Sequence, residues 1–165
     1  MNLIDTYLAT FDAEAAGTRR LLARVPEGKG DWKPHEKSTA LGHLAAHVAT
    51  LPRFALMAAT EPGFDFAAPG GFTIPPFTTG AALVETFDGE MRRMREAVGA
   101  MGPERLEEPW TLRAGEHVIF VEPRVAVLWR WTLSHLVHHR GQLTVYLREL
   151  GVPLPSLYGP TADEH

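Results

Sequence analysis

The distribution of apolar residues along the chain predicts four amphipathic helices. In four segments the apolar side chains recur every three or four positions, which places them on one face of a helix. The segments cover about residues 3–25, 38–55, 83–101 and 123–150. The clearest stripes are Ile4, Tyr7, Phe11, Ala15, Leu22 and Val25 in the first helix, Leu44, Val48, Leu51 and Ala55 in the second, and Leu83, Phe87, Met91, Met94, Val98 and Met101 in the third.

Capping residues, prolines and glycines predict where these helices begin and end. Ser38 or Thr39 can cap the second helix, because their side chains accept from exposed backbone amides. Pro52 should bend that helix, since it removes one backbone donor. Pro123 is tolerated in a first helical turn, and Gly151 is typical of the residue that stops a helix.

The long connections and the predicted helices together suggest a fold class. The connection "EPGFDFAAPGGFTIPPF" (residues 61–77) is rich in Pro and Gly, and short alternation around Ala114 and Gly115 allows a β-hairpin. Four amphipathic helices of this size bury their stripes most economically as a bundle. We therefore predict an all-α fold in a single domain spanning residues 1–165: a four-helix bundle with long crossover connections and a small β-hairpin before the last helix. The Pro-rich residues 151–165 should lie along the surface.

Composition and charge narrow the range of partners. The chain has 165 residues, of which 45% are hydrophobic and 22% charged, which is typical of a globular protein. Sixteen Lys and Arg against 20 Asp and Glu give a formal charge of −4, so we expect no nucleic-acid partner. No apolar run approaches the length of a membrane span, and the first residues do not resemble a secretion signal, so we expect no membrane partner and a cytoplasmic protein. The absence of cysteine excludes disulfides, thiolate metal ligands and a cysteine nucleophile.

The candidate chemistry is carried by histidines that fall on the predicted helices. At about 100° per residue, with Leu128 as origin, His135 and His139 fall at about −20° and +20°, in the middle of the expected core-facing stripe of the fourth helix. His47 falls inside the apolar arc of the second helix, His43 about 40° further out, and His138 at about −80°. Three histidines are thus predicted to point inward: His47, His135 and His139.

A shared metal ion explains three inward histidines better than hydrogen bonding does. A single buried histidine is more often a hydrogen-bonded core residue than a ligand. Three neutral imidazoles need partners that a stripe of Leu, Val and Ala cannot supply. A pair four residues apart presents two ring nitrogens to one point, and a third histidine from a facing helix completes an open set that suits zinc, nickel, iron or cobalt. "HLVHH" lacks the Glu of a zincin protease, and no G-x-S-x-G supports a serine hydrolase.

Other polar residues receive structural interpretations. Gln142 projects close to the histidine face, where it can hydrogen-bond a ligand or simply cap the wet end of the site. Arg140 projects off the stripe and is expected in a surface or interhelix ion pair. Tyr146 should pack in the core with its hydroxyl hydrogen-bonded. Asp163 and Glu164 are expected to be solvated, as acidic termini usually are.

Three stretches make the chain similar to a known family. "LGHLAAHVATLP" (residues 41–52), "PWTLRAGEHVIFVEPR" (109–124) and "SHLVHHRGQLTVYLRELGVPLPSLYGPTADE" (134–164) resemble the DinB-like family of four-helix-bundle metalloproteins, over nearly the whole chain. The resemblance implies a divalent metal ion held by one histidine of the second helix and two of the fourth, which correspond to His47, His135 and His139. It also implies a homodimer.

The reaction is left open at this level. The resemblance implies a metal-dependent transferase in which a low-molecular-weight thiol is the second cofactor and a small molecule the substrate. A bound divalent ion equally suits a hydrolase, since it lowers the pKa of a water as well as of a thiol. A metal-binding stress-response protein without turnover, and a bundle whose histidines bond through buried water, are the non-catalytic alternatives.

Overall fold

The computed structural model describes residues 2–165 and shows a mostly helical chain with one small sheet. In chain order the helices are α1 (Leu3–Leu22), α2 (Leu41–Thr50), α3 (Pro52–Thr60), α4 (Gly80–Ala100), the 3-10 helix η1 (Pro103–Glu107), α5 (Arg124–Ala126), the π-helix η2 (Val127–Ser134) and α6 (His135–Glu149). The strands are β1 (Gly63–Asp65), β2 (Pro109–Ala114) and β3 (His117–Pro123). Among these residues no helix combines the length and apolarity needed to cross a membrane.

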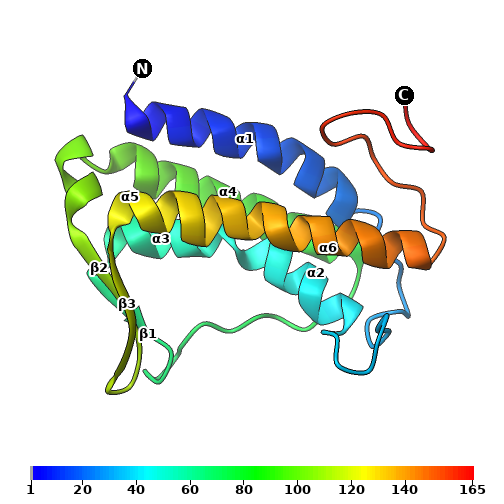
Figure 1. The fold of residues 1–165 in the computed structure, drawn as a ribbon, viewed down its shortest axis with the longest axis horizontal. Helices are drawn as coiled ribbons and strands as arrows, with labels where there is room; N and C mark the ends of the chain where they lie inside the picture. The colour runs from blue at the N-terminus through cyan, green and yellow to red at the C-terminus, as the bar shows by residue number, and fades with distance from the viewer. Residues whose placement is uncertain (1) are drawn as a thin grey trace.

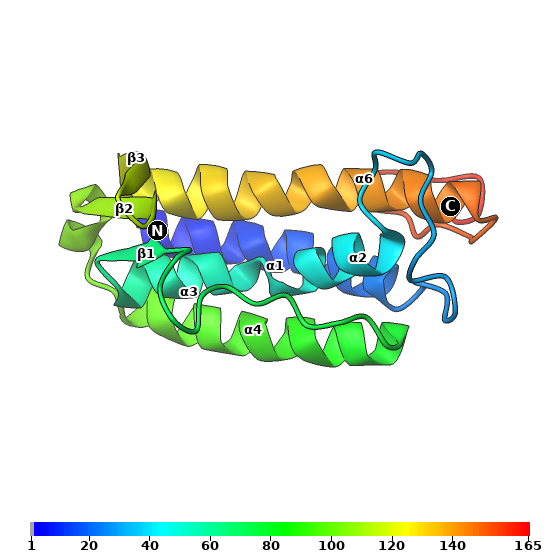
Figure 2. The same cartoon turned by 90° about the horizontal axis from the view of Figure 1, so that it is seen from below.

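Four helical columns run along the long axis of the molecule (Figure 1). They are α1, α4, the pair α2 and α3, and the continuous run of α5, η2 and α6. α4 packs against α1, α2 and α3, while α6 packs against α2 and α1. The connection after β1 returns along the length of the molecule before α4 begins, so α4 and the α2–α3 column point the same way (Figure 2). This connection is a long crossover, as predicted, whereas the connection after α4 stays at one end and forms η1, β2 and β3.

The predicted hairpin is present and belongs to a three-stranded sheet. β2 and β3 pair in antiparallel fashion, with Gly115 at φ +62° in the turn between them. β1 pairs in parallel with β2, Gly63 opposite Thr111. A Cβ on Gly63 would lie 2.5 Å from the carbonyl oxygen of Thr111, so only glycine fits there. β1 was not predicted, because three residues inside a Pro/Gly-rich stretch carry no readable alternation.

The second predicted helix is divided at Pro52 and starts later than expected. Pro52 is the first residue of α3, where its missing N–H leaves no bond unmade. The prediction of a Ser38 or Thr39 cap was wrong: the N-cap is Ala40, which makes no side-chain cap. The first amides of α2 instead donate to the preceding loop, Leu41 N–H to the Trp32 carbonyl and Gly42 N–H to the Gly30 carbonyl, each at 2.9 Å. The loop 26–40 is therefore fastened to the start of α2.

The π-helix shifts the face that the last helix buries. The buried residues of α6 are Leu136, Arg140, Leu143 and Leu147. His135 and His139 are half-buried at the edge of that stripe, so the prediction that they lie in its middle was wrong, as was the placing of Arg140 off the stripe. The predicted angles of the last helix were measured from Leu128, which lies inside η2. Because π-helical bonds span five residues, each residue there turns the chain by less than the α-helical 100°, and the error carried into α6.

Arg140 forms a buried interhelix ion pair, which was one of its two predicted roles. Its side chain is 3% exposed and bonds to the carboxylate of Glu14 on α1. It also donates to the Glu14 carbonyl at 2.9 Å and to the Tyr158 hydroxyl at 2.7 Å. This cluster fastens α1, α6 and the C-terminal tail together.

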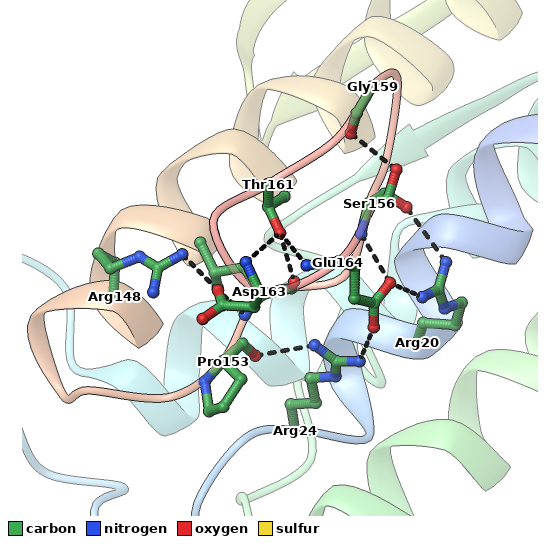
Figure 3. A network of polar contacts seen from close by, with 10 residues as sticks. Arg20, Arg24, Arg148, Pro153, Ser156, Gly159, Thr161, Asp163 and Glu164 are labelled. Carbon is green, nitrogen blue, oxygen red and sulfur yellow. Dashed lines mark hydrogen bonds and ion pairs between the residues drawn. The ribbon is translucent and has the colours of Figure 1, made fainter.

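Residues 151–165 follow the surface as predicted, but their acidic side chains are paired rather than merely solvated (Figure 3). Glu164 pairs with Arg20 and Arg24 of α1 and accepts from the Ser156 amide at 3.0 Å. Asp163 pairs with Arg148 of α6 at 2.6 Å and accepts from the Leu154 amide at 2.9 Å. The prediction of solvated termini was therefore wrong, since the tail connects α1 to α6 through charge-assisted bonds.

Candidate metal centre

The structure brings His47, His135 and His139 together between α2 and α6. One ring nitrogen from each lies within 4.8 Å of the others. The ring centroid of His47 is 5.2 Å from that of His135 and 4.7 Å from that of His139. His135 and His139 are neighbours because residues four apart lie one above the other on an α-helix. Helix α6 starts at His135, directly after η2, so the π-segment determines the direction in which the pair points.

Hydrogen bonds assign the tautomers of the two α6 histidines. The Nδ1 of His135 lies 3.3 Å from the Trp131 carbonyl oxygen, which can only accept, so Nδ1 carries the proton. The Nδ1 of His139 lies 2.7 Å from Oε1 of Gln142 and donates to it. In both neutral rings the lone pair therefore sits on Nε2. The two Nε2 atoms are 2.8 Å apart, a distance at which two lone pairs repel unless they share a cation.

The surroundings keep all three imidazoles neutral. Burial, together with the neighbouring His139, His135 and His43, lowers the pKa of His47 to about 4. Burial is also the largest cause that lowers the pKa values of His135 and His139, partly opposed at His139 by the bond to Gln142. Because a metal ligand must offer a lone pair, neutral histidines are the state that a divalent ion needs.

His47 has one buried ring nitrogen whose hydrogen bond is unmade within the described part of the chain. Its Nδ1 is buried and has no hydrogen-bond partner among residues 2–165. A buried ring nitrogen left unpaired costs free energy, and such atoms are uncommon in folded proteins. Three neutral imidazoles with one ring nitrogen each within 4.8 Å of the others, two of them facing each other as lone pairs, fit a divalent ion of the zinc or nickel type.

The two other histidines of the predicted helices, His43 and His138, stay outside the cluster. His43 is exposed one turn before His47, and His138 is exposed with its ring centroid 4.8 Å from that of His139. Neither belongs to the group of converging ligand atoms among the described residues. No fourth side chain therefore closes the set from the described part of the chain.

A pocket opens beside the cluster. It has a volume of about 380 Å³ and is lined by His47 and His139 together with Gln142, Tyr146, Leu44, Ile74, His43 and the loop residues Lys37, Ser38 and Thr39. A second pocket of about 540 Å³ shares His43 and Ile74 with it. His47 and His139 line the first pocket and His135 does not, so a small molecule there would lie against two of the three rings.

Gln142 lies beside the histidines and Tyr146 packs against the core, as the sequence suggested, and the structure identifies the hydrogen-bond partner of each. Gln142 orients a histidine, whereas the sequence suggested a bond to ligand or substrate or a cap on the wet end of the site. Tyr146 is half-buried, and its hydroxyl donates to the Thr39 carbonyl at 3.2 Å. That bond ties α6 to the loop that forms the far wall of the pocket.

The sequence reasoning missed the pocket's loop residues. Lys37 and Ser38 follow a proline-containing loop without periodicity, and no pattern in the sequence places them opposite α6. Gly30 in the loop and Gly42 in α2 were a partial sign in the sequence that the loop packs closely against α2. A Cβ on Gly42 would lie 2.7 Å from Cβ of Phe77 and 3.1 Å from Cα of Gly30, so close packing at this end depends on glycine.

Comparisons of sequence and of structure both relate this chain to DinB-family proteins over nearly its whole length. The family model of the DinB family matches residues 1–165. The uncharacterized protein YrdA of Bacillus subtilis (strain 168) is 24% identical over 165 residues, which cover 98% of this chain and 91% of YrdA. The crystal structure of a DinB-like protein from Bacillus cereus superposes with a TM-score of 0.71 at 20% identity, covering 93% of this chain and 97% of the other. A DinB-like protein from Bacillus subtilis gives a TM-score of 0.69 at 20% identity, with coverages of 94% and 99%.

Proposed function

This chain belongs to the DinB family, and we propose that it holds one divalent metal ion with His47, His135 and His139 and acts as a metal-dependent transferase on a thiol. The observation that carries the proposal is the 2.8 Å separation of the two Nε2 atoms of His135 and His139 while both Nδ1 atoms donate elsewhere. Two lone pairs held this close by their own helix favour a cation between them.

A divalent ion with an open coordination position supplies Lewis-acid chemistry, which polarises a bound ligand and lowers the pKa of a water or thiol. The chain's own residues do the positioning. Gln142 holds the tautomer and ring orientation of His139, and the Trp131 carbonyl does the same for His135. Leu44 and Ile74 contribute apolar side chains to the wall of the pocket.

The lining of the pocket favours thiol transfer over hydrolysis. Metal-dependent hydrolases of the zincin type use a carboxylate as general base for the attacking water. None of the residues lining the pocket at His47 and His139 is acidic. A thiol whose pKa is lowered by a metal needs no such base, and since the chain has no cysteine, the thiol has to arrive on a small molecule.

The proposal also covers the helix arrangement, the oligomeric state and the location of the protein. We propose that the four columns form a four-helix bundle in one domain over residues 1–165, and that the protein acts in the cytoplasm as a homodimer. The match of the family over the whole chain supports the first part. Sedimentation at micromolar concentration tests the dimer.

The metal proposal is tested by elemental analysis of protein purified without an affinity tag and loaded with zinc or nickel. We expect one equivalent of metal in the wild type and in His138→Ala, whose ring is exposed beside the cluster. His135→Ala should retain less than a tenth of an equivalent. Absence of metal from the wild type after loading would overturn the proposal.

The reaction is tested separately on the metal-loaded protein. A panel of low-molecular-weight thiols is combined with electrophilic acceptors, and loss of free thiol is followed in the wild type and in His47→Ala. Turnover that requires both thiol and His47 supports a transferase. Turnover of esters or phosphoesters without any thiol would favour the hydrolase instead.

A further inference from the structure

We infer that the pocket beside the three histidines binds a small dianionic ligand, with one carboxylate or phosphate group held by Lys37 and the reacting group directed at the histidine cluster. The inference deepens the proposed function, because it names the charge of the substrate or thiol that this same site takes. It rests on the lining of the pocket, on its charge and on the way the loop 26–40 is held.

The pocket is positively charged although the protein is negatively charged. Lys37 is the one formally charged residue among the ten that line it. The chain as a whole carries 20 acidic and 16 basic side chains. A pocket wall with one ammonium group and no carboxylate, next to a proposed divalent ion, attracts anions and repels cations.

Lys37 is free to take a ligand. Its ammonium group takes part in none of the side-chain hydrogen bonds or ion pairs of residues 2–165, in contrast to most of the arginines. The side chain is exposed, and the adjacent Glu36 does not line the pocket. A lysine ammonium offers three donors on a flexible stem, which suits a carboxylate or a phosphate group.

Neutral donors surround the same space. Ser38 and Thr39 line the pocket, and neither hydroxyl has a hydrogen-bond partner among the described residues. The Oε1 of Gln142 accepts from His139, which leaves the amide NH₂ of Gln142 to donate into the pocket. These groups supply donors for an acceptor-rich ligand.

The loop that carries Lys37 is held in place. Two of its carbonyls accept from the first amides of α2, and its Trp32 ring lies edge-on to Tyr146, with centroids 5.7 Å apart. Next to Lys37, the Ser38 amide donates to the His35 carbonyl at 2.9 Å, and the Lys37 amide donates to Nδ1 of His35 at 3.2 Å. The backbone of Lys37 is thus positioned before any ligand arrives, which lowers the entropy lost on binding.

The test compares two probes that differ in one charge. Succinate carries two carboxylates, and succinamate carries one carboxylate and one neutral amide of similar shape. Titration calorimetry measures both on zinc-loaded and on metal-free protein, for the wild type, Lys37→Met and Lys33→Met. Lys33 is an exposed lysine of the same loop that does not line the pocket, so it controls for the loss of net charge.

We expect the zinc-loaded wild type to prefer succinate over succinamate by about tenfold, the low end for a hydrogen bond to a charged group. Lys37→Met should lose this preference, and Lys33→Met should keep it within twofold. Phosphonoacetate as a third probe distinguishes the two anion types, since tighter binding than succinate identifies a phosphate-bearing ligand and weaker binding a dicarboxylate. In the zinc-loaded protein, a wild-type ratio near one, or a ratio that survives Lys37→Met, would overturn the inference.

The two proposals fail separately in this experiment. Metal content is measured on the same samples, so a wild type without zinc counts against the metal site. The affinity for succinate in the metal-free protein still decides the role of Lys37, because Lys37→Met should weaken it there and Lys33→Met should not. Normal zinc content together with an unchanged ratio in Lys37→Met leaves the metal proposal intact and removes only the anion site.

Discussion

Nε2 of His135 lies 2.8 Å from Nε2 of His139, one turn apart on α6. With Nδ1 of each ring donating to an oxygen, the two facing nitrogens are both acceptors. The arrangement depends on Gln142, because an amide turned the other way would move the His139 proton to Nε2 and give an ordinary hydrogen bond to His135. The orientation of one glutamine thus separates a metal-binding pair from a hydrogen-bonded pair.

Gln142 should therefore control metal affinity without being a ligand. We expect Gln142→Leu to weaken zinc binding by about 10–100-fold, as loss of a ligand-orienting hydrogen bond typically does. Gln142→Glu should bind zinc more tightly than the wild type, because a carboxylate makes the imidazole a stronger donor to the metal. Competition with a chromogenic chelator measures both, with His138→Ala as control. Equal affinity in all four proteins would contradict the role of Gln142.

Metal loading should stabilise the fold. An ion that binds only the folded state at a hundredfold excess over its Kd adds about 2.7 kcal/mol, which raises Tm by roughly 5–10 °C for a chain of this size. Scanning calorimetry with and without excess zinc measures the shift. His47→Ala should show no shift, since one of three ligands is missing. A shift of the same size in His47→Ala would place the stabilising ion elsewhere.

The buried pair of Arg140 and Glu14 should be important for stability. Arg140→Met removes one partner and leaves the Glu14 carboxylate, which is 16% exposed, without its cation. We expect a loss of about 3–5 kcal/mol in the free energy of unfolding, measured by urea titration with tryptophan fluorescence. Tyr158→Phe removes only a hydroxyl from the same cluster and should cost about 1 kcal/mol. A cost below about 1 kcal/mol for Arg140→Met would show that the pair is not needed.

The tail should make stability depend on acid pH. The Ser156 amide, Arg24 and Arg20 hold the pKa of Glu164 at about 2, below its usual value near 4.5. A lowered pKa in the folded state gives stability that is fully present above about pH 4.5 and is lost as pH falls from there towards 2. Glu164→Gln should flatten the unfolding free energy over this range, while Glu149→Gln, exposed at the end of α6, should follow the wild type. Parallel curves for wild type and Glu164→Gln would exclude the contribution.

The sequence was sufficient for the helices because their stripes are formed by local spacing. Phe87, Met91 and Met94 recur on one face whatever they pack against, and they are buried in α4 as expected. The three histidines could be singled out for the same reason, since His135 and His139 are one turn apart in any α-helix. The error in the predicted angles of α6 did not affect the pairing of these two histidines, because the π-segment precedes both of them and rotates both by the same amount.

The pairings that the sequence could not provide depend on contacts between distant segments. Glu164 becomes an ion-pair partner only because residues 151–165 return to Arg20, more than a hundred residues earlier, and nothing near Glu164 signals that path. Lys37 lines the same pocket as His47 and His139 only because loop 26–40 folds onto the start of α2. Such pairings are decided by tertiary packing and not by local propensity.

The π-segment also bears on how related chains should be compared. A π-turn accommodates one residue more than an α-turn over the same length, so a helix can gain or lose a residue between Val127 and Ser134 without changing the direction of α6. Alignment gaps at this point are therefore compatible with an intact histidine pair. The spacing that must stay constant between relatives begins at His135, and the distance in sequence back to the hairpin carries little diagnostic weight.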